Sequence, residues 1–117
     1  MSKNTTEFVR RIAVLAEANE RLCDVLERQR VFMADAATNI GNSGLTIGGL
    51  LSGGAADMRE ELTTALDDFE IARHAVRLSL YAVLGLDQGE SISQFARSLG
   101  ISRQLASRLA REVAEEA

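Results

Sequence analysis

The side chains best suited to molecular recognition gather in the last quarter of the sequence. The stretch from Ser91 to Arg111 contains four arginines and no carboxylate, whereas the stretch from Val31 to Glu90 contains nine carboxylates and three arginines. A guanidinium group presents its N–H donors in a fixed fork that fits phosphate oxygens and the acceptor edge of a base. Although the formal net charge is −4, this uneven distribution predicts an anionic partner for one part of the chain.

Around these arginines the residue types predict two short helices joined by a sharp turn. Ser91 and Gln94 have the spacing of a capping box at the start of the first helix. Ala96 lets the helices meet closely, and Gly100 can adopt the positive φ that the turn requires. Ser102 can accept from the free N–H groups that begin the second helix. The expected buried side of the pair consists of Phe95, Leu99, Ile101, Ala106 and Leu109.

With these residues in register, the stretch 91–111 resembles the helix-turn-helix unit of small bacterial, phage or plasmid regulators. The resemblance implies that a helix from Arg103 to Glu112 enters the major groove of double-stranded DNA. The side chains expected to contact DNA are Arg97, Ser102, Arg103, Gln104, Ser107, Arg108 and Arg111. Among them, base edges are assigned to Arg103, Gln104 and Ser107 or Arg108. Arg97 and Arg111 are expected to hold phosphates.

The main expectation is therefore a dimeric, sequence-specific transcriptional regulator, but the sequence leaves two other functions open. Glu112, Glu115 and Glu116 follow the arginines at once and would weaken non-specific binding to DNA. A helical protein-interaction or assembly module without DNA affinity could contain the same stretch. The third alternative is an architectural DNA-binding protein that serves partition, packaging or recombination.

No grouping of residues predicts catalysis, and we expect no enzyme activity, no cofactor and no metal. His74 is the one histidine, and we expect it to be a partly exposed or hydrogen-bonded structural residue. Cys23 lies on an apolar helix face and is expected to be a small buried hydrophobic residue. Adjacent acids such as Asp67 and Asp68 point about 100° apart on a helix, so they cannot easily share a proton or a metal.

Residues 1–40 predict a long amphipathic helix that mediates oligomerisation. Asn4 and Glu7 have the spacing of a capping box. Beyond them, positions recur every seven residues in two rows, which are Phe8, Leu15, Leu22, Gln29 and Ala36, and Ile12, Asn19, Leu26, Met33 and Ile40. Rows that alternate by four and three residues form the seam of a coiled coil. The residues expected to mediate oligomerisation are Phe8, Ile12, Leu15, Asn19, Leu22, Leu26 and Met33.

The polar residue Asn19 bears on how such helices would pair. Its side chain is best satisfied when it meets its twin across a parallel two-stranded seam, where it fixes register. The rows beside the seam are also apolar, which suits a helix contacted on two sides. A homodimer is expected, while a bundle helix with a partly solvated Asn19 remains the alternative.

Residues 41–54 hold six of the nine glycines and are expected to connect two helical parts. Their apolar members are Leu45, Ile47, Leu50 and Leu51, so we expect part of the segment to dock on the helices or to contact a partner protein. Gly44 and Gly49 have the separation found in a phosphate-binding loop. However, Leu50 stands where such a loop needs lysine, and no strand precedes it.

Residues 55–117 are expected to form a helical DNA-binding domain, with the helix-turn-helix at 91–111. A second long helix should run from Asp57 to about Leu84. Its last turns should complete the core of the domain through Leu78, Tyr81, Ala82 and Leu86. Further DNA contacts are expected from Arg73, Arg77 or Tyr81. Only six residues follow Arg111, so no β-wing is expected.

Composition sets the fold class and the expected location. A hydrophobic content of 46% without proline predicts an all-α protein. The single cysteine excludes an intramolecular disulfide and suits a reducing cytoplasm. No apolar run approaches the roughly 20 residues that span a bilayer, and the first residues do not resemble a signal peptide. We therefore expect a cytoplasmic, nucleoid-associated protein without membrane contact.

Overall fold

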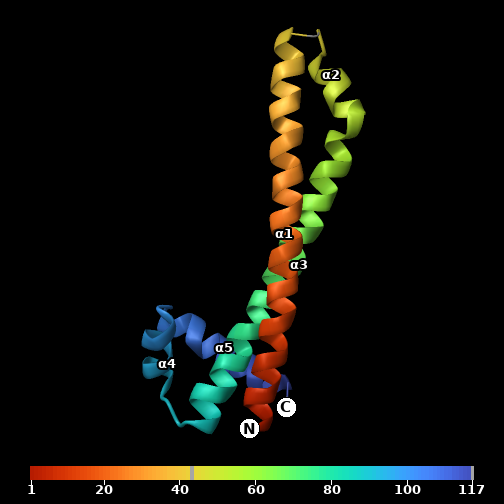
Figure 1. The fold of residues 1–117 in the computed structure, drawn as a ribbon. Coiled ribbons are helices and arrows are strands. Elements are labelled where there is room, and N and C mark those ends of the chain that lie inside the picture. Colours follow the sequence, from red (N-terminus) through yellow and green to blue (C-terminus); the bar gives the residue numbers. More distant parts are fainter. Residues whose placement is uncertain (43, 117) are drawn as a thin grey trace. The chain divides into compact units, whose positions relative to one another are not determined.

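A computed structural model describes residues 1–42 and 44–116, and in these ranges it contains helices and no strand. This finding confirms the expected all-α class. In chain order the elements are α1 (Lys3–Asn42), α2 (Ile47–Leu50), η1 (Leu51–Ala55), α3 (Ala56–Tyr81), η2 (Ala82–Asp87), α4 (Ile92–Leu99) and α5 (Arg103–Glu116) (Figure 1). The segment η2 consists of helical turns of the wider π type, whereas η1 is a kink at which Gly53 and Gly54 do not have helical dihedral angles. Within the described ranges, no helix has both the length and the apolar character that a bilayer crossing demands.

The chain divides into two compact units. Unit 1 comprises Met1–Ala16 and Ile71–Ala117, and unit 2 comprises Glu17–Glu70. The two long helices α1 and α3 each contribute residues to both units.

Unit 1 is built on a core that joins the end of α3 and η2 to α4 and α5. Its buried members are Leu78, Ala82, Phe95, Ala96, Ala106, Leu109 and Val113. Phe95 and Leu109 are the largest fully buried side chains. The ring of Tyr81 meets that of Phe95 edge to face, with 5.2 Å between centroids. Such a pair adds about 0.5–1.5 kcal/mol to the burial of the rings.

The core agrees with the residues expected from the sequence, with one exception. Leu99 and Ile101 are partly buried against it, and Leu78, Tyr81 and Ala82 supply the third helical side. Leu86, by contrast, is 59% exposed, so its predicted burial is wrong. It lies in the π-type turns of η2, where the helical register on which the expectation rested no longer holds.

The start of α1 is capped by a different residue from the one expected. The Ser2 hydroxyl accepts from the backbone N–H of Thr5 at 3.1 Å. The expected cap, Asn4, lies inside the helix and donates its amide to Asp87 Oδ1 at 2.9 Å and to the Ala82 carbonyl at 3.4 Å. The capping prediction is therefore wrong, because Asn4 makes a tertiary contact with η2 instead of a local one.

Unit 2 pairs part of α1 with part of α3 through small residues. Ala18, Val25 and Ala36 of α1 and Ala65 of α3 are buried. Small side chains let two helix backbones approach closely. At the edge of this contact, Arg28 bridges Glu61 at 2.6 Å and Asp24 at 3.2 Å.

The Gly-rich segment is more helical than a simple connector. The helix α1 continues through Gly41 to Asn42. Thr46 then caps α2 by accepting from the N–H of Gly49 at 3.0 Å. Gly53 and Gly54 leave helical geometry, with φ of −96° and 113°, and thereby separate these turns from α3. Leu45 and Leu50 are half-buried whereas Ile47 and Leu51 are exposed, so part of the segment docks on its own unit.

Candidate functional site

The candidate site lies on α4, α5 and the turn between them, and all three belong to unit 1. The expected capping box starts α4, because the Ser91 N–H donates to Gln94 Oε1 at 2.8 Å and the Gln94 N–H donates to Ser91 Oγ at 3.2 Å. Gly100 ends α4 with a φ of 67°, in the left-handed region that costs other residues energy. The Ile101 N–H donates back to the Ala96 carbonyl at 3.0 Å. These local predictions are confirmed.

The turn fixes both the start and the orientation of α5. The Ser102 hydroxyl accepts from the N–H of Leu105 at 3.1 Å, as expected for the cap of this helix. One side of α5 is then buried in the core through Ala106, Leu109 and Val113. A helix held by its cap and by three buried side chains presents its opposite side in a fixed orientation.

The opposite side carries the residues expected to contact DNA. Arg103, Gln104, Arg108 and Arg111 are exposed, and Ser107 is half-buried. Spacings of three and four residues, as from Arg103 to Ser107, from Gln104 to Arg108 and from Arg108 to Arg111, keep them together on one broad face of the helix. From the neighbouring elements, Arg97 of α4 and Ser102 of the turn are exposed as well. We call these seven residues the arginine face.

Within the described ranges, no hydrogen bond or ion pair engages the side chains of Arg97, Arg103, Arg108 and Arg111. The four guanidinium groups consequently keep all of their N–H donors available for a ligand. A fork of such donors on a rigid helix can bind phosphate oxygens or the edge of a guanine.

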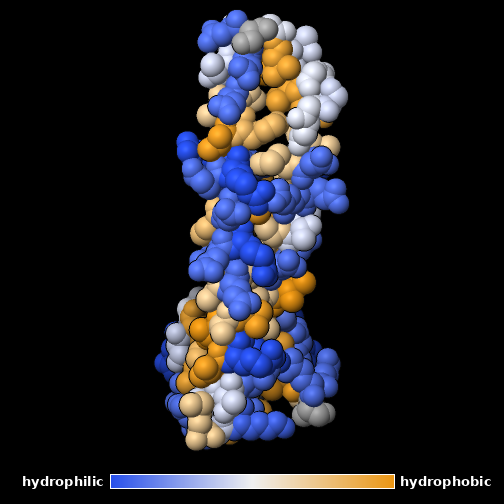
Figure 2. Space-filling model, turned by 45° about the vertical axis from the view of Figure 1, so that its right-hand side comes forward, coloured by the Kyte–Doolittle hydropathy of each residue, from blue (hydrophilic) through white to orange (hydrophobic). Residues whose placement is uncertain are grey.

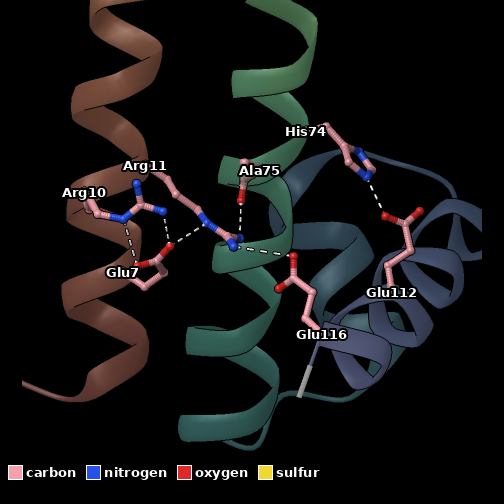
Figure 3. A network of polar contacts seen from close by, with 7 residues as sticks. All are labelled: Glu7, Arg10, Arg11, His74, Ala75, Glu112 and Glu116. Carbon is pink, nitrogen blue, oxygen red and sulfur yellow. Dashed lines mark hydrogen bonds and ion pairs between the residues drawn. The ribbon is translucent and has the colours of Figure 1, made fainter.

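Two of the three acidic residues that follow the arginine face, Glu112 and Glu116, contact other helices (Figure 3). A carboxylate oxygen of Glu112 lies 2.6 Å from Nε2 of His74 on α3. Glu116 accepts from Arg11 of α1 at 3.4 Å. Glu115 is exposed. His74 therefore has the partly exposed, hydrogen-bonded position expected of it, with 45% of its side chain accessible.

Arg11 of α1 contacts the C-terminal end of α5 through Glu116. The sequence did not predict a role for this residue. Only 17% of its side chain is exposed. Its guanidinium donates to the Ala75 carbonyl at 3.0 Å and to Glu7 Oε1 at 3.0 Å, besides its bond to Glu116 (Figure 3). The one available signal was its position in the sequence between the apolar residues Phe8 and Leu15.

Glu7 is also held by the neighbouring arginine. Hydrogen bonding from Arg10, assisted by its charge and by Arg11, lowers the pKa of Glu7 to about 2 against a smaller opposing effect of desolvation. The carboxylate is therefore ionised under all but strongly acidic conditions and can keep Arg11 in place.

The structure separates the two rows of the predicted oligomerisation seam on α1. Phe8, Leu15 and Leu22 are half-buried within the chain. The other row is exposed, and its members are Ile12, Asn19, Leu26 and Met33. The predicted seam is thus not one free surface, because contacts inside the chain cover the first row.

Cys23 is exposed, so its predicted burial is wrong. It lies beside the exposed row of α1 and not on the face that Ala18 and Val25 bury. Within the described ranges, no group of three or more His, Cys, Asp or Glu side chains is placed to hold a metal ion.

The site consists of a fixed helix that exposes unpaired guanidinium groups and an amide on one face. Comparison of the chain with protein-family models, with curated proteins and with solved structures found no match.

Proposed function

We propose that this protein binds double-stranded DNA in a sequence-specific manner, with α5 in the major groove. The observation that carries the proposal is the set of four exposed arginines without an acidic partner, on a helix pair fixed by a common core. A major groove about 12 Å wide admits one α-helix. Residues 91–111 resemble a helix-turn-helix unit, and in such units the second helix lies in the major groove.

The residues of the arginine face divide into two roles. The N-terminal half of α5 approaches the bases, which assigns base reading to Arg103, Gln104 and Ser107 or Arg108. Arginine pairs with guanine and glutamine with adenine, at about 1–3 kcal/mol of discrimination for each good pair. Arg97 and Arg111 stand at the two edges and hold phosphates.

Ser102 marks a candidate phosphate position at the start of α5. Its hydroxyl oxygen caps the helix, and the N–H groups of this first turn carry partial positive charge. A phosphate placed there would gain from the partial positive charge of the helix end.

The position of Glu112 and Glu116 supports the proposal. Acids on the same helix as a DNA-binding face weaken binding when they pair with its arginines or face the phosphates. Here Glu112 contacts His74 and Glu116 contacts Arg11. The arginine face thus retains its charge despite the net charge of −4 of the chain.

The biological role that we favour is that of a dimeric transcriptional regulator acting on the nucleoid. Two subunits related by a two-fold axis would read half-sites about 34 Å apart, or a multiple of that distance. Architectural binding, in partition, packaging or recombination, would instead give a footprint that spreads over many helical turns.

A protein-interaction module without DNA is the second candidate, and the exposed apolar row of α1 favours it. Ile12, Leu26 and Met33 are between 41% and 57% exposed, which suits a helical partner. A protein of this kind would form a stable protein complex and bind no DNA even at low salt.

Selection of bound fragments from random DNA duplexes tests the proposal. We expect enrichment of a defined sequence, and we expect the Gln104→Ala variant to lose its preference for adenine at one position of that sequence while keeping the others. Recovery of no enriched sequence by the wild-type protein, together with no retention of duplex at low salt, would refute it.

A further inference from the structure

From Asn19 onward, in unit 2, the exposed row of α1 belongs to a second heptad seam. Its members recur at alternating steps of four and three residues: Asn19, Cys23, Leu26, Arg30, Met33, Ala37 and Ile40. All seven are exposed, Leu26 by 46% and Met33 by 57%. We call them the outer seam. This spacing is that of the two central rows of a coiled coil.

The outer seam is separate from the face that α1 uses inside the unit. That inner face buries Ala18, Val25 and Ala36, and it half-buries Leu22 and Phe32. Hydrophobic residues open to solvent are visible among the hydrophilic ones in Figure 2. A helix with two adjacent apolar faces, of which one is covered, has room for a second helical partner.

We propose that the outer seam binds the outer seam of a second copy of this chain in antiparallel orientation, with Asn19 of each copy opposite Arg30 of the other. In this register Cys23 of one copy faces Leu26 of the other. The polar residues then meet each other, because the carbonyl oxygen of an asparagine accepts from a guanidinium group. Each small cysteine meets a large leucine, which fills the layer evenly.

A parallel pair would match these residues less well. It would place Arg30 against Arg30, and two guanidinium groups cannot bond to each other because both are donors only. It would also place the small Cys23 against its twin. The proposal therefore replaces the parallel meeting of two Asn19 side chains that the sequence suggested.

Within unit 2 this register forms two kinds of layer, one of Asn19 with Arg30 and one of Cys23 with Leu26. A register that satisfies both layers at once indicates one specific partner, a second copy of the chain.

Arg30 is already arranged for this role. Its Nε and Nη2 donate to the carboxylate of Glu27 at 3.0 Å and 2.7 Å. This exposed ion pair engages two of the three guanidinium nitrogens. The remaining nitrogen, Nη1, keeps both of its protons for Asn19 of the second copy.

Disulfide trapping tests the register. The Leu26→Cys variant retains Cys23, and in the proposed dimer these two positions face each other within the roughly 4.4–6.8 Å between Cα atoms that a disulfide requires. Mild oxidation should convert this variant to a covalent dimer on a non-reducing gel. Val31→Cys, which replaces another exposed residue away from the outer seam, is the matched control and should remain largely monomeric.

Two results of this experiment would overturn the proposal. One is a wild-type protein that crosslinks through Cys23 as fast as the Leu26→Cys variant, because only the parallel register brings Cys23 against its twin. The other is a Leu26→Cys variant that gives no covalent dimer and sediments as a monomer.

A double-mutant cycle on the dimer dissociation constant tests the polar pair. Asn19 and Arg30 are separated by about 16 Å along one helix, so they cannot contact each other within one copy. We expect Asn19→Leu and Arg30→Leu each to raise the dissociation constant roughly tenfold, which corresponds to about 1.4 kcal/mol. The double variant should return to the wild-type value or below. Additive effects would contradict the contact.

Both experiments are carried out without DNA. A monomeric protein would therefore refute the dimer while leaving the proposed DNA binding intact. A stable dimer that binds no DNA would support the dimer and refute the proposed DNA binding.

Discussion

Glu112 lies 2.6 Å from His74, although Arg108 stands one helical turn before it on α5. A glutamate and an arginine four residues apart on a helix commonly form an ion pair. The contact with α3 holds the glutamate away from that pair. An exposed histidine thus contributes to keeping an arginine of the candidate DNA-binding face available.

We predict that His74→Ala weakens DNA binding by a few fold. The freed Glu112 can then pair with Arg108 and compete with DNA for its guanidinium. Fluorescence anisotropy with a labelled duplex measures the affinity. Stability should change by only about 0–1 kcal/mol, because the pair with Glu112 is exposed and screened.

A double variant that combines His74→Ala with Glu112→Ala controls for the loss of the histidine itself. It removes the competing carboxylate, so its DNA affinity should return at least to the wild-type value. Equal weakening in both variants would show that His74 acts without Glu112.

We predict that Gly100→Ala lowers the free energy of unfolding by about 1–2 kcal/mol, since a side chain in the left-handed region is strained. The φ of Gly100 is 67°, and a Cβ built there meets no atom within 4 Å. Backbone strain is therefore the sole cost of the substitution. Urea denaturation followed by circular dichroism measures it.

Two matched variants accompany Gly100→Ala. Gly100→Asn should lose less stability, because asparagine tolerates this conformation better. Gly41→Ala, at an open position inside α1, should be neutral or stabilising by up to about 1 kcal/mol. A Gly100→Ala variant as stable as Gly41→Ala would contradict the role of the turn.

The sequence predicted those parts of the fold that depend on neighbouring residues. The Ser91 capping box, the positive φ of Gly100 and the Ser102 cap each depend on groups within four residues. The prediction for Asn4 failed because its partner, Asp87, is 83 residues away. Local patterns do not report such tertiary contacts.

The same distinction applies to α1. Its heptad pattern predicts apolar rows but not which row the rest of the chain covers. The structure shows Leu15 and Leu22 half-buried and Leu26 and Met33 exposed. That outcome depends on where α3 packs, which the spacing within α1 cannot specify. Arg11 was missed for the same reason, since two of its partners, Ala75 and Glu116, are distant in sequence.

We predict that Phe95→Ala destabilises the chain by about 3–5 kcal/mol, the usual cost of truncating a buried aromatic residue. Phe95 is 0% exposed. It anchors α4 in the core, and its ring packs against that of Tyr81. Thermal unfolding measures the loss. Ile71→Ala, at a position that is 70% exposed, should change stability by less than about 0.5 kcal/mol. Comparable losses in the two variants would contradict the assigned core.

We predict that Glu7 makes stability depend on pH in the acid range. Because the folded chain lowers the pKa of Glu7 from 4.5 to about 2, its stabilising effect is complete above pH 4.5 and is lost as the pH falls to about 2. The wild type should therefore exceed Glu7→Gln in melting temperature at neutral pH, and the difference should vanish near pH 2.

Thermal melts at low salt provide this comparison. The control is Glu17→Gln, which removes an exposed carboxylate that has no ion pair in the described part of the chain. A difference between wild type and Glu7→Gln that stays constant down to pH 2 would contradict the assignment.

The central claim is that DNA is bound by the arginine face, and anisotropy titration of the Arg103→Ala, Arg108→Ala double variant tests it most directly. The control is Arg21→Ala, Arg59→Ala, which removes the same charge from two exposed arginines elsewhere. On the selected duplex, we expect the first variant to lose about 2–6 kcal/mol, roughly 30-fold or more in affinity. The control should bind within a few fold of wild type, with a similar salt dependence. Unchanged binding by the Arg103→Ala, Arg108→Ala variant would contradict the account.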